Sequence, residues 1–263
     1  MVFKSITKST YLAEALEALR AAKRVDTVDQ LMEIYTINQN STHSRQTCWN
    51  EIRKRYLTIK EGRIIKTPLL KIIDFSGEKL NKELLYHSYL MKEPIAREIV
   101  LKYIYPELTV DNSFILDNKN LVLFLKKYIG NFRDTTIKKT AASIRKALVD
   151  FGIGREENGD VFVSYYSPSI YSFIYALYSE YSPGYDEAKR FNILNPSLQH
   201  ITEKAEFYKM FFINPKLLRT YLDSAWEQNY LVYEPRGGLD QYVLKHESLD
   251  GIVNYLLKGD KDE

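Results

Sequence analysis

The sequence predicts a mainly α-helical protein that contains helix-turn-helix or winged-helix units with short β-hairpin wings. Apolar residues recur at helical spacing along most of the 263 residues. In addition, two helical stretches are followed by a glycine-containing turn and a short alternating strand. A basic helix followed by a β-hairpin is the order in which a winged helix approaches a nucleic-acid backbone.

The best-formed example lies between residues 134 and 166. A helix begins at Asp134 or Thr135, and its apolar side chains fall on one face. Small and basic residues occupy the opposite face, where they permit close approach to phosphates. The basic residues expected to contact DNA here are Arg133, Lys138, Lys139, Arg145 and Lys146. Asn158-Gly159 favours a turn with positive φ, and a strand from Val161 follows.

The N-terminal third has a helix-turn-helix-like order. Helices are expected over 9–24, from 26 or 27, and from Ser41 or Ser44, the last with Cys48 facing inward. The segment from Ser41 to Lys71 carries eight basic and two acidic residues. Four basic residues near or on the outer face of the third helix are candidate DNA contacts: Arg45, Arg53, Lys54 and Arg55.

The remainder is also mostly helical. Further helices are expected over 68–73, 80–91, 94 to about 106, 118–129, 168–181, 201–212, 215–228 and 248–257, with strands at 231–233 and 241–244. The helix after Pro168 is apolar nearly all round, which predicts a buried position. Polar loops divide the chain into three expected domains: a helical one at 1–108, a winged-helix-like one at 109–184, and a helical unit with a hairpin at 185–263.

Composition bounds the class of protein. The net charge of +3 and pI near 8.6 are mild, so the clustering of basic residues matters more than their number. One cysteine excludes an internal disulfide and fits a reducing compartment. The longest apolar runs are short and carry charges, which argues against membrane insertion. We therefore expect a cytoplasmic protein.

Enzymatic patterns are weak. The four histidines are far apart, so neither a metal nor another cofactor is expected, and no phosphate-binding loop is present. Glu187-Ala188-Lys189 has a nuclease-like spacing, but three-residue patterns recur by accident. The thiol of Cys48 fits a structural role better than a nucleophilic one. Tyr171, Tyr175 and Tyr178 could stack on single-stranded bases, although such a stripe is more often core. No catalytic activity is expected.

A pattern in the first half resembles a known family. An opening helix is followed by Ser41-Thr42, Arg45, Glu51-Ile52 and Arg55-Tyr56 on one helix, then by Leu69-Leu70 and a helix around Leu84 to Tyr89. This resembles BrxA, a small component of the BREX (bacteriophage exclusion) defence systems, most clearly over residues 9–130. The resemblance implies a helical, non-catalytic DNA-binding protein that works beside a methyltransferase, an ATPase and other members of its system.

These observations predict a non-catalytic protein that binds double-stranded DNA with little sequence preference, within an anti-phage defence system of the BREX type. The neutralisation of phosphates by lysine and arginine would make this binding sensitive to salt. Two alternatives stay open. In one, the basic faces bind acidic partners in a protein–protein adaptor, and in the other they bind RNA.

Overall fold

The computed structural model describes residues 9–182 and 193–259, which are mainly helical with small antiparallel sheets. The chain divides into two compact units, and we describe each by itself. Unit 1 comprises residues up to 73 together with 81–165, and unit 2 comprises 74–80 together with 166 onwards. The sequence suggested three domains with a first boundary at 108. That position lies inside unit 1, because helix and strand continue through it.

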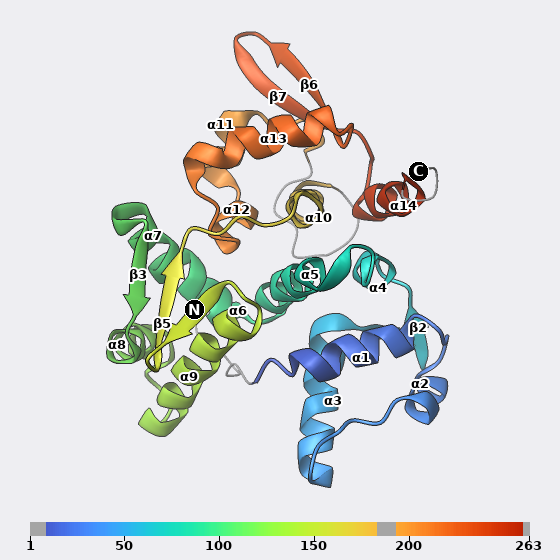
Figure 1. Cartoon of the computed structure of the whole chain (residues 1–263), viewed down its shortest axis with the longest axis vertical. Coiled ribbons are helices and arrows are strands. Elements are labelled where there is room, and N and C mark those ends of the chain that lie inside the picture. Colours follow the sequence, from blue (N-terminus) through green and yellow to red (C-terminus); the bar gives the residue numbers. More distant parts are fainter. Residues whose placement is uncertain (1–8, 183–192, 260–263) are drawn as a thin grey trace. The chain divides into compact units, whose positions relative to one another are not determined.

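Unit 1 begins with three helices and a hairpin (Figure 1). These elements are α1 (Leu12–Ala22), α2 (Val28–Ile34), α3 (Thr42–Tyr56), β1 (Thr58–Lys60) and β2 (Arg63–Ile65). Thr27 caps α2 through a reciprocal capping box with Gln30, and the Ser41 hydroxyl accepts from the Ser44 amide to cap α3. The predicted order of three short helices is confirmed.

The next part of unit 1 is a run of helices whose last section differs from the prediction. It comprises α4 (Pro68–Ile72), α5 (Gly77–Lys92, of which residues 81–92 belong to this unit), α6 (Pro94–Ile99), the π-helix η1 (Val100–Ile104) and α7 (Tyr105–Asp111). The helix was expected to stop near Pro106, and this was wrong. A π turn, in which the Tyr105 amide donates to the Val100 carbonyl, precedes Pro106. Pro106 then sits in the first turn of α7, where its missing N–H costs little.

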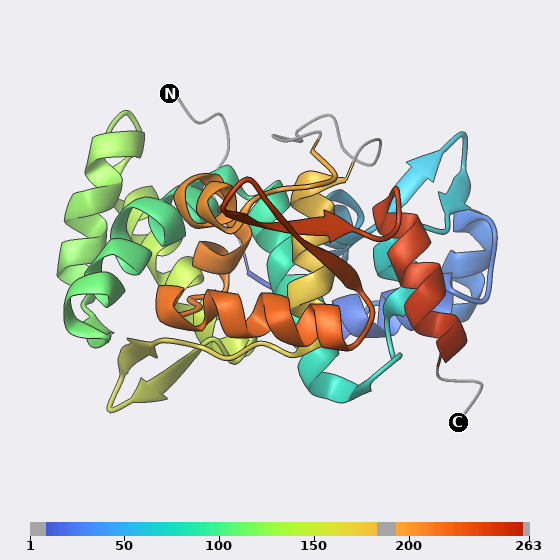
Figure 2. The same ribbon diagram turned by 90° about the horizontal axis from the view of Figure 1, so that it is seen from above.

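Unit 1 ends with two helices and a three-stranded sheet. The elements are β3 (Ser113–Leu116), α8 (Asn118–Ile129), α9 (Asp134–Asp150), β4 (Gly154–Glu157) and β5 (Asp160–Ser164), and the sheet order is β3-β5-β4. Residues 108–114, expected to form a polar loop, are instead the end of α7 and the start of β3. Asn158 (φ 52°) and Gly159 (φ 85°) make the predicted turn at the tip of the β4–β5 hairpin (Figure 2).

Unit 2 is built around α10 (Ile170–Tyr181), which is buried over most of its length as predicted. Of the tyrosines at helical spacing on α10, Tyr175 and Tyr178 are buried in the core, as the packing interpretation predicts. Tyr171 is half-buried. The Glu180 carboxylate accepts from the amides of Glu206 and Phe207 and thereby stabilises the start of α12 (Phe207–Met210).

The rest of unit 2 repeats the order of helix and hairpin. Its elements are α11 (Leu198–Lys204), α12 (Phe207–Met210), η2 (Pro215–Leu217), α13 (Leu218–Glu227), β6 (Leu231–Arg236), β7 (Leu239–Leu244) and α14 (Leu249–Gly259). The single helix expected over 201–212 is two short helices. Strands β6 and β7 form a twisted two-stranded ribbon (Figure 2).

Within the described residues, three hairpins share one design. Each follows a helix and turns on two residues with positive φ, the second a glycine: Glu61-Gly62, Asn158-Gly159 and Gly237-Gly238. In each case the second strand of the hairpin also pairs with an extended segment from earlier in the chain. That segment lies before the helices that lead to the hairpin. These segments are residues 26–28 on β2, strand β3 on β5, and residues 194–197 on β7. The same topology therefore occurs three times, although the sequence shows no repeat.

A buried histidine makes the stability of unit 1 depend on pH. Burial, together with the nearby Arg97 guanidinium, lowers the pKa of His87 to about 3. In the unfolded chain a histidine titrates near 6.5. As the pH falls from 6.5 towards 3, the unfolded chain takes up a proton that the folded chain does not. The free energy of unfolding should therefore fall by about 1.4 kcal/mol per pH unit from this group.

This pH dependence can be measured by urea unfolding between pH 7 and pH 4 for the wild type and for His87→Gln. The amide cannot take up a proton, so the variant should lose stability less steeply than the wild type over this range. Equal slopes would contradict the assignment of the pH dependence to His87.

Candidate nucleic-acid interface

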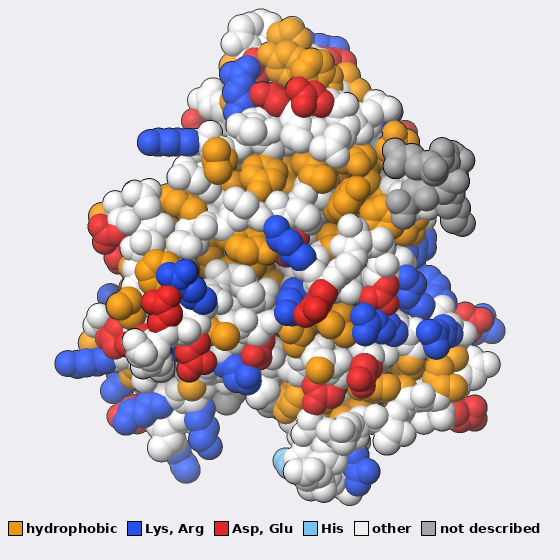
Figure 3. All heavy atoms as spheres, viewed as in Figure 1, with side chains coloured by type: hydrophobic (Ala, Val, Ile, Leu, Met, Phe, Trp, Pro, Cys, Tyr) orange, Lys and Arg blue, Asp and Glu red, His pale blue; other side chains and the backbone are white. Residues whose placement is uncertain are grey.

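The exposed face of α9 is basic and contains a small residue at its centre. Lys138, Lys139, Ala142 and Lys146 are exposed, whereas Ile137, Ala141, Ile144 and Leu148 are buried, as the periodicity predicts. No ion pair to Lys138 or Lys139 occurs within the described part of the chain. Figure 3 shows lysine and arginine side chains gathered over the part of unit 1 where α8 and α9 lie. These two ammonium groups are available to an anion.

The start of α9 adds one more cation. Arg133 is the residue before the helix, its side chain is exposed, and the amides of the first turn of α9 follow it. A helix N-terminus carries a partial positive charge that favours phosphate. Asp134 lies in the same turn, but its carboxylate pairs with Lys126 at 3.1 Å. The N-terminal half of α9 is therefore the more electropositive part.

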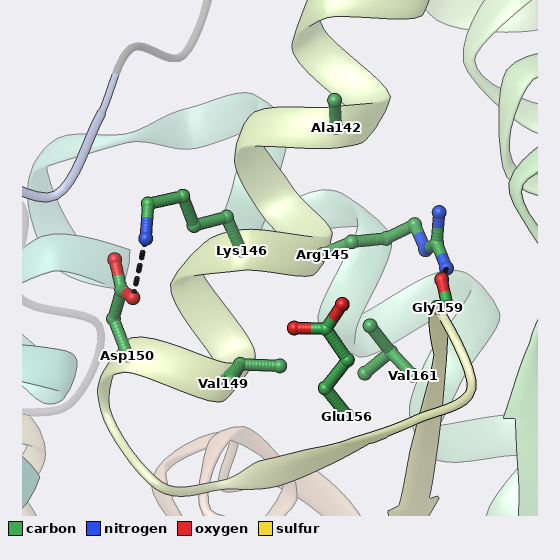
Figure 4. Close-up of a pocket in the computed structure, with 8 residues that line it drawn as sticks. All are labelled: Ala142, Arg145, Lys146, Val149, Asp150, Glu156, Gly159 and Val161. Atoms are coloured by element: carbon green, nitrogen blue, oxygen red, sulfur yellow. Dashed lines mark hydrogen bonds and ion pairs between the residues drawn. The ribbon is translucent and has the colours of Figure 1, made fainter.

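Arg145 has a different place from that expected. One Nη donates to the Gly159 carbonyl at 2.8 Å and lies 3.5 Å from the Asp160 carboxylate, and the side chain is 16% exposed. Figure 4 shows the guanidinium reaching from α9 to the hairpin turn. Arg145 therefore links α9 to the β4–β5 hairpin, and its guanidinium is engaged by the turn instead of being available to a phosphate.

Replacing Arg145 with alanine should loosen the β4–β5 hairpin while the fold of unit 1 persists. The turn at Gly159 would lose its charge-assisted hydrogen bond, which contributes about 1.5–3 kcal/mol. Hydrogen exchange at the amides of 156–161 should accelerate, whereas exchange in α1 should stay unchanged. The exposed Lys139→Ala is the control, and equal protection in both variants would contradict this role.

The β4–β5 hairpin is acidic, which the sequence reading did not weigh. Glu156, Glu157 and Asp160 are exposed on or beside its turn, and the single arginine of these strands, Arg155, pairs with Glu157 at 2.6 Å. The same arginine lies 4.5 Å from the ring centroid of Phe162. Carboxylates repel phosphate, so this hairpin would be a poor phosphate contact, and the candidate face narrows to α9.

A cavity of about 250 Å³ lies between α9 and this hairpin (Figure 4). It is lined by Ala142, Arg145, Lys146, Val149, Asp150, Glu156, Gly159 and Val161. Lys146 points along the helix to Asp150, with 2.8 Å between the charged atoms. The lining contains acids, bases and aliphatic groups, without a thiol, a hydroxyl or an imidazole side chain.

The four candidates on α3 separate into two pairs. Arg45 and Arg53 are exposed and fit the expected contact face. Lys54 is 43% exposed but pairs with Glu93 at 2.9 Å. Arg55 is buried, and its expected role in binding DNA is corrected here: a guanidinium with no exposed side-chain surface cannot reach a phosphate.

Arg55 instead holds the interior of unit 1 together. Its Nε lies 2.9 Å from the Glu93 carboxylate, one Nη lies 3.0 Å from Glu51, and the other donates to the Ser9 carbonyl at 2.6 Å. Its guanidinium carbon lies 5.2 Å from the ring centroid of Tyr89. Both carboxylates are nearly fully buried. The sequence predicted Arg55 near the outer face of α3, but the helical period turns it inward, two residues after the exposed Arg53.

The exposed face of α3 carries polar side chains that the charge count did not single out. Gln46 donates to Asn50 at 3.1 Å, and both residues are exposed between Arg45 and Arg53. Glutamine and asparagine are the side chains that pair with adenine in the major groove. Their helical spacing of four was the available signal, and it was missed because only charge was counted.

Other candidate chemistries gain little from the geometry. Cys48 is buried, and burial raises its thiol pKa to about 12, with the Glu14 carboxylate adding to the effect, so it stays a thiol. Within residues 9–182 and 193–259, no group of three or more His, Cys, Asp or Glu residues could hold a metal ion. Glu187-Ala188-Lys189 lies outside the described residues. Among the described helices, none combines the length and apolarity needed to cross a membrane.

Comparison with known proteins shows a similar fold in a solved structure but no matching protein family. No family model matches the chain, and no curated protein matches it. One solved structure, described as "SspB crystal structure", resembles it with a TM-score of 0.58 and 12% sequence identity. The likeness covers 98% of this chain and 86% of the other. At this identity the likeness extends to the fold alone, which is that of a mainly helical protein with small antiparallel sheets.

Proposed function

We propose that the protein binds double-stranded DNA through the exposed face of α9, as a non-catalytic component of a BREX-type defence system. The observation that carries the DNA-binding part is the pair of exposed, unbridged ammonium groups of Lys138 and Lys139 on a helix that precedes a β-hairpin. The part in defence rests on the resemblance of residues 9–130 to BrxA.

The topology around α9 supports a winged-helix interpretation. Elements α7, β3, α8, α9, β4 and β5 follow one another, and the sheet order β3-β5-β4 places the first strand beside the last. In helix-turn-helix proteins the second helix of the pair lies in the major groove, and here α9 follows α8 after four residues. We assign α9 to the groove.

Two features favour weak sequence preference at α9. Beyond Asp134 in the first turn, its exposed side chains are lysines, an alanine and threonine, which contact phosphates rather than base edges. Ala142 in the centre of this face lets the helix axis approach the duplex closely. Arg45 and Arg53 on α3 form a second proposed contact face within unit 1.

Salt-dependent binding tests this function. Fluorescence anisotropy of two labelled duplexes of unrelated sequence, measured between 50 and 200 mM salt, should give similar affinities that fall steeply as salt rises. Each neutralised phosphate contributes about 0.9 to the slope of log K against log salt. Absence of binding at 50 mM salt would refute the proposal.

A protein–protein adaptor is the second candidate, because the β4–β5 hairpin exposes Glu156, Glu157 and Asp160 where a phosphate contact would need cations. An adaptor of this kind would bind neither duplex at low salt. A matched RNA hairpin in the same measurement separates RNA binding from DNA binding.

A further inference from the structure

The face shared by η1 and α8 carries three half-buried aromatic rings. Tyr103 and Phe124 stack with their ring centroids 4.8 Å apart and an interplanar angle of 21°, and Tyr128 continues the series 5.2 Å from Phe124. Aromatic residues that close a core are usually buried on all sides, whereas each of these keeps part of its surface in solvent. The three rings form one continuous aromatic surface.

Two lysines accompany these rings. The ammonium of Lys127 lies 5.7 Å from the ring centroid of Phe124, and that of Lys102 lies 5.9 Å from Tyr128. Lys102 also pairs with Glu98. Helix α8 carries three lysines and no acidic residue, so its exposed surface is positive. We call Tyr103, Phe124, Tyr128, Lys102 and Lys127 the aromatic–lysine patch.

The π-helix positions half of this patch. The wide turn at Val100–Ile104 carries both Lys102 and Tyr103, and it arises beside Pro106, which has no amide to donate to the Lys102 carbonyl. Single-turn π-helices occur frequently at functional sites. Burial raises the pKa of Tyr103, and the carboxylates of Glu107 and Asp117 raise it further, so its ring stays neutral.

We propose that the aromatic–lysine patch binds unpaired bases of single-stranded DNA. Proteins that bind single strands without sequence preference combine aromatic rings on which bases stack with cations that follow the backbone. Here both components come from adjacent turns of η1 and α8. The inference rests on the proposed function, because α8 packs directly beside α9, and it extends that function to duplexes that end in a single strand.

The chemistry of the patch favours this occupant over a protein segment. A protein partner for a half-exposed aromatic face needs apolar groups, whereas the lysines beside Phe124 and Tyr128 favour a polyanion. Leu123, which is 54% exposed on α8, adds apolar area that the flat face of a base can cover as well. Bases with a phosphate backbone satisfy the rings and the ammonium groups together.

The experiment compares three DNA forms bound by the full chain at one salt concentration. They are a blunt duplex, the same duplex with a ten-nucleotide thymine overhang, and that overhang with one 2-aminopurine in it. The overhang should increase affinity about tenfold over the blunt duplex, which is within the range for stacking of one or two bases. The fluorescence of 2-aminopurine should be quenched on binding, because the base stacks on a ring.

Phe124→Leu with Tyr128→Leu removes two rings but keeps apolar side chains that preserve packing. This variant should lose the tenfold gain and the quenching, while its affinity for the blunt duplex stays unchanged. The matched control is Tyr255→Leu, which removes a half-buried ring from unit 2 and should retain both effects. Circular dichroism of each variant verifies the fold.

The outcomes separate the two proposals. If the wild type binds blunt and overhang duplexes equally, without quenching, the patch proposal is overturned and the duplex function stands. If it binds the overhang duplex with quenching but does not bind the blunt duplex, the duplex function is overturned and the patch proposal stands. Quenching that persists in the Phe124→Leu, Tyr128→Leu variant places the bases elsewhere and overturns the patch proposal. A uridine overhang that binds equally well extends the ligand to RNA through the same stacking chemistry.

Discussion

Replacing Arg55 with alanine is expected to lower the free energy of unfolding of unit 1 by about 3–5 kcal/mol. The substitution removes the cation that the buried carboxylates of Glu51 and Glu93 face at 3.0 and 2.9 Å. Two carboxylates would then stay in a low-dielectric interior without the guanidinium that faces both of them, although Lys54 still lies beside Glu93. Such a loss is a large part of the stability of an ordinary domain.

Urea unfolding followed by tryptophan fluorescence measures this effect. Trp49 lies in unit 1 and Trp226 in unit 2, so a Trp226→Phe background restricts the signal to unit 1. The midpoint should fall strongly with an unchanged slope. Arg53→Ala, two residues away but exposed, is the control and should change stability by less than about 0.5 kcal/mol. A loss below about 1 kcal/mol for Arg55→Ala would show that the carboxylates find other partners.

Reversing the charge at Lys138 and Lys139 is expected to weaken DNA binding by at least about tenfold without unfolding the protein. Each lysine contributes about one unit to the salt slope when it contacts a phosphate, so the slope should fall by about two. Since neither side chain is bridged in the described chain, the substitutions leave no buried partner uncompensated. The change should be the same for duplexes of any sequence.

The control is Lys216→Glu with Lys258→Glu, which alters net charge equally in unit 2. If both double variants lose affinity equally, binding depends on total charge and α9 is not the contact surface. Arg145 is unsuitable for this test, because its substitution would also release the hairpin. A loss of DNA affinity in an Arg145 variant could come either from a lost contact of Arg145 with DNA or from movement of the β4–β5 hairpin.

Local patterns predicted much of the fold. The stripe Ile137, Ala141, Ile144 and Leu148 identified the buried face of α9, and Asn158-Gly159 identified its turn. Long-range pairing was beyond these patterns. Residues 26–28 reach β2 and residues 194–197 reach β7, and nothing in the intervening sequence marks either partner. The threefold occurrence of one topology is therefore visible in the structure but not in the amino-acid sequence.

The candidate site was less predictable than the fold, because charge type does not determine exposure. Arg53 and Arg55 are two residues apart, and the helical period places one in solvent and the other in the interior. Arg145 faces a carbonyl of a hairpin that lies fourteen residues onward. Whether a cation meets a phosphate or a buried carboxylate depends on partners that a composition count does not contain.

The shared hairpin design also has a kinetic consequence. A two-residue turn brings its strands together through contacts that are local in sequence, and a hairpin of this kind forms in about 1–10 μs. The later step, in which an extended segment joins the second strand, closes a loop of several dozen residues and is entropically slower. Glycine at the second turn position adopts the positive φ that hairpin formation requires. We therefore expect Gly62, Gly159 and Gly237-Gly238 to influence how fast each region folds. Replacing one of them would slow its own hairpin first, before the distant pairing can begin.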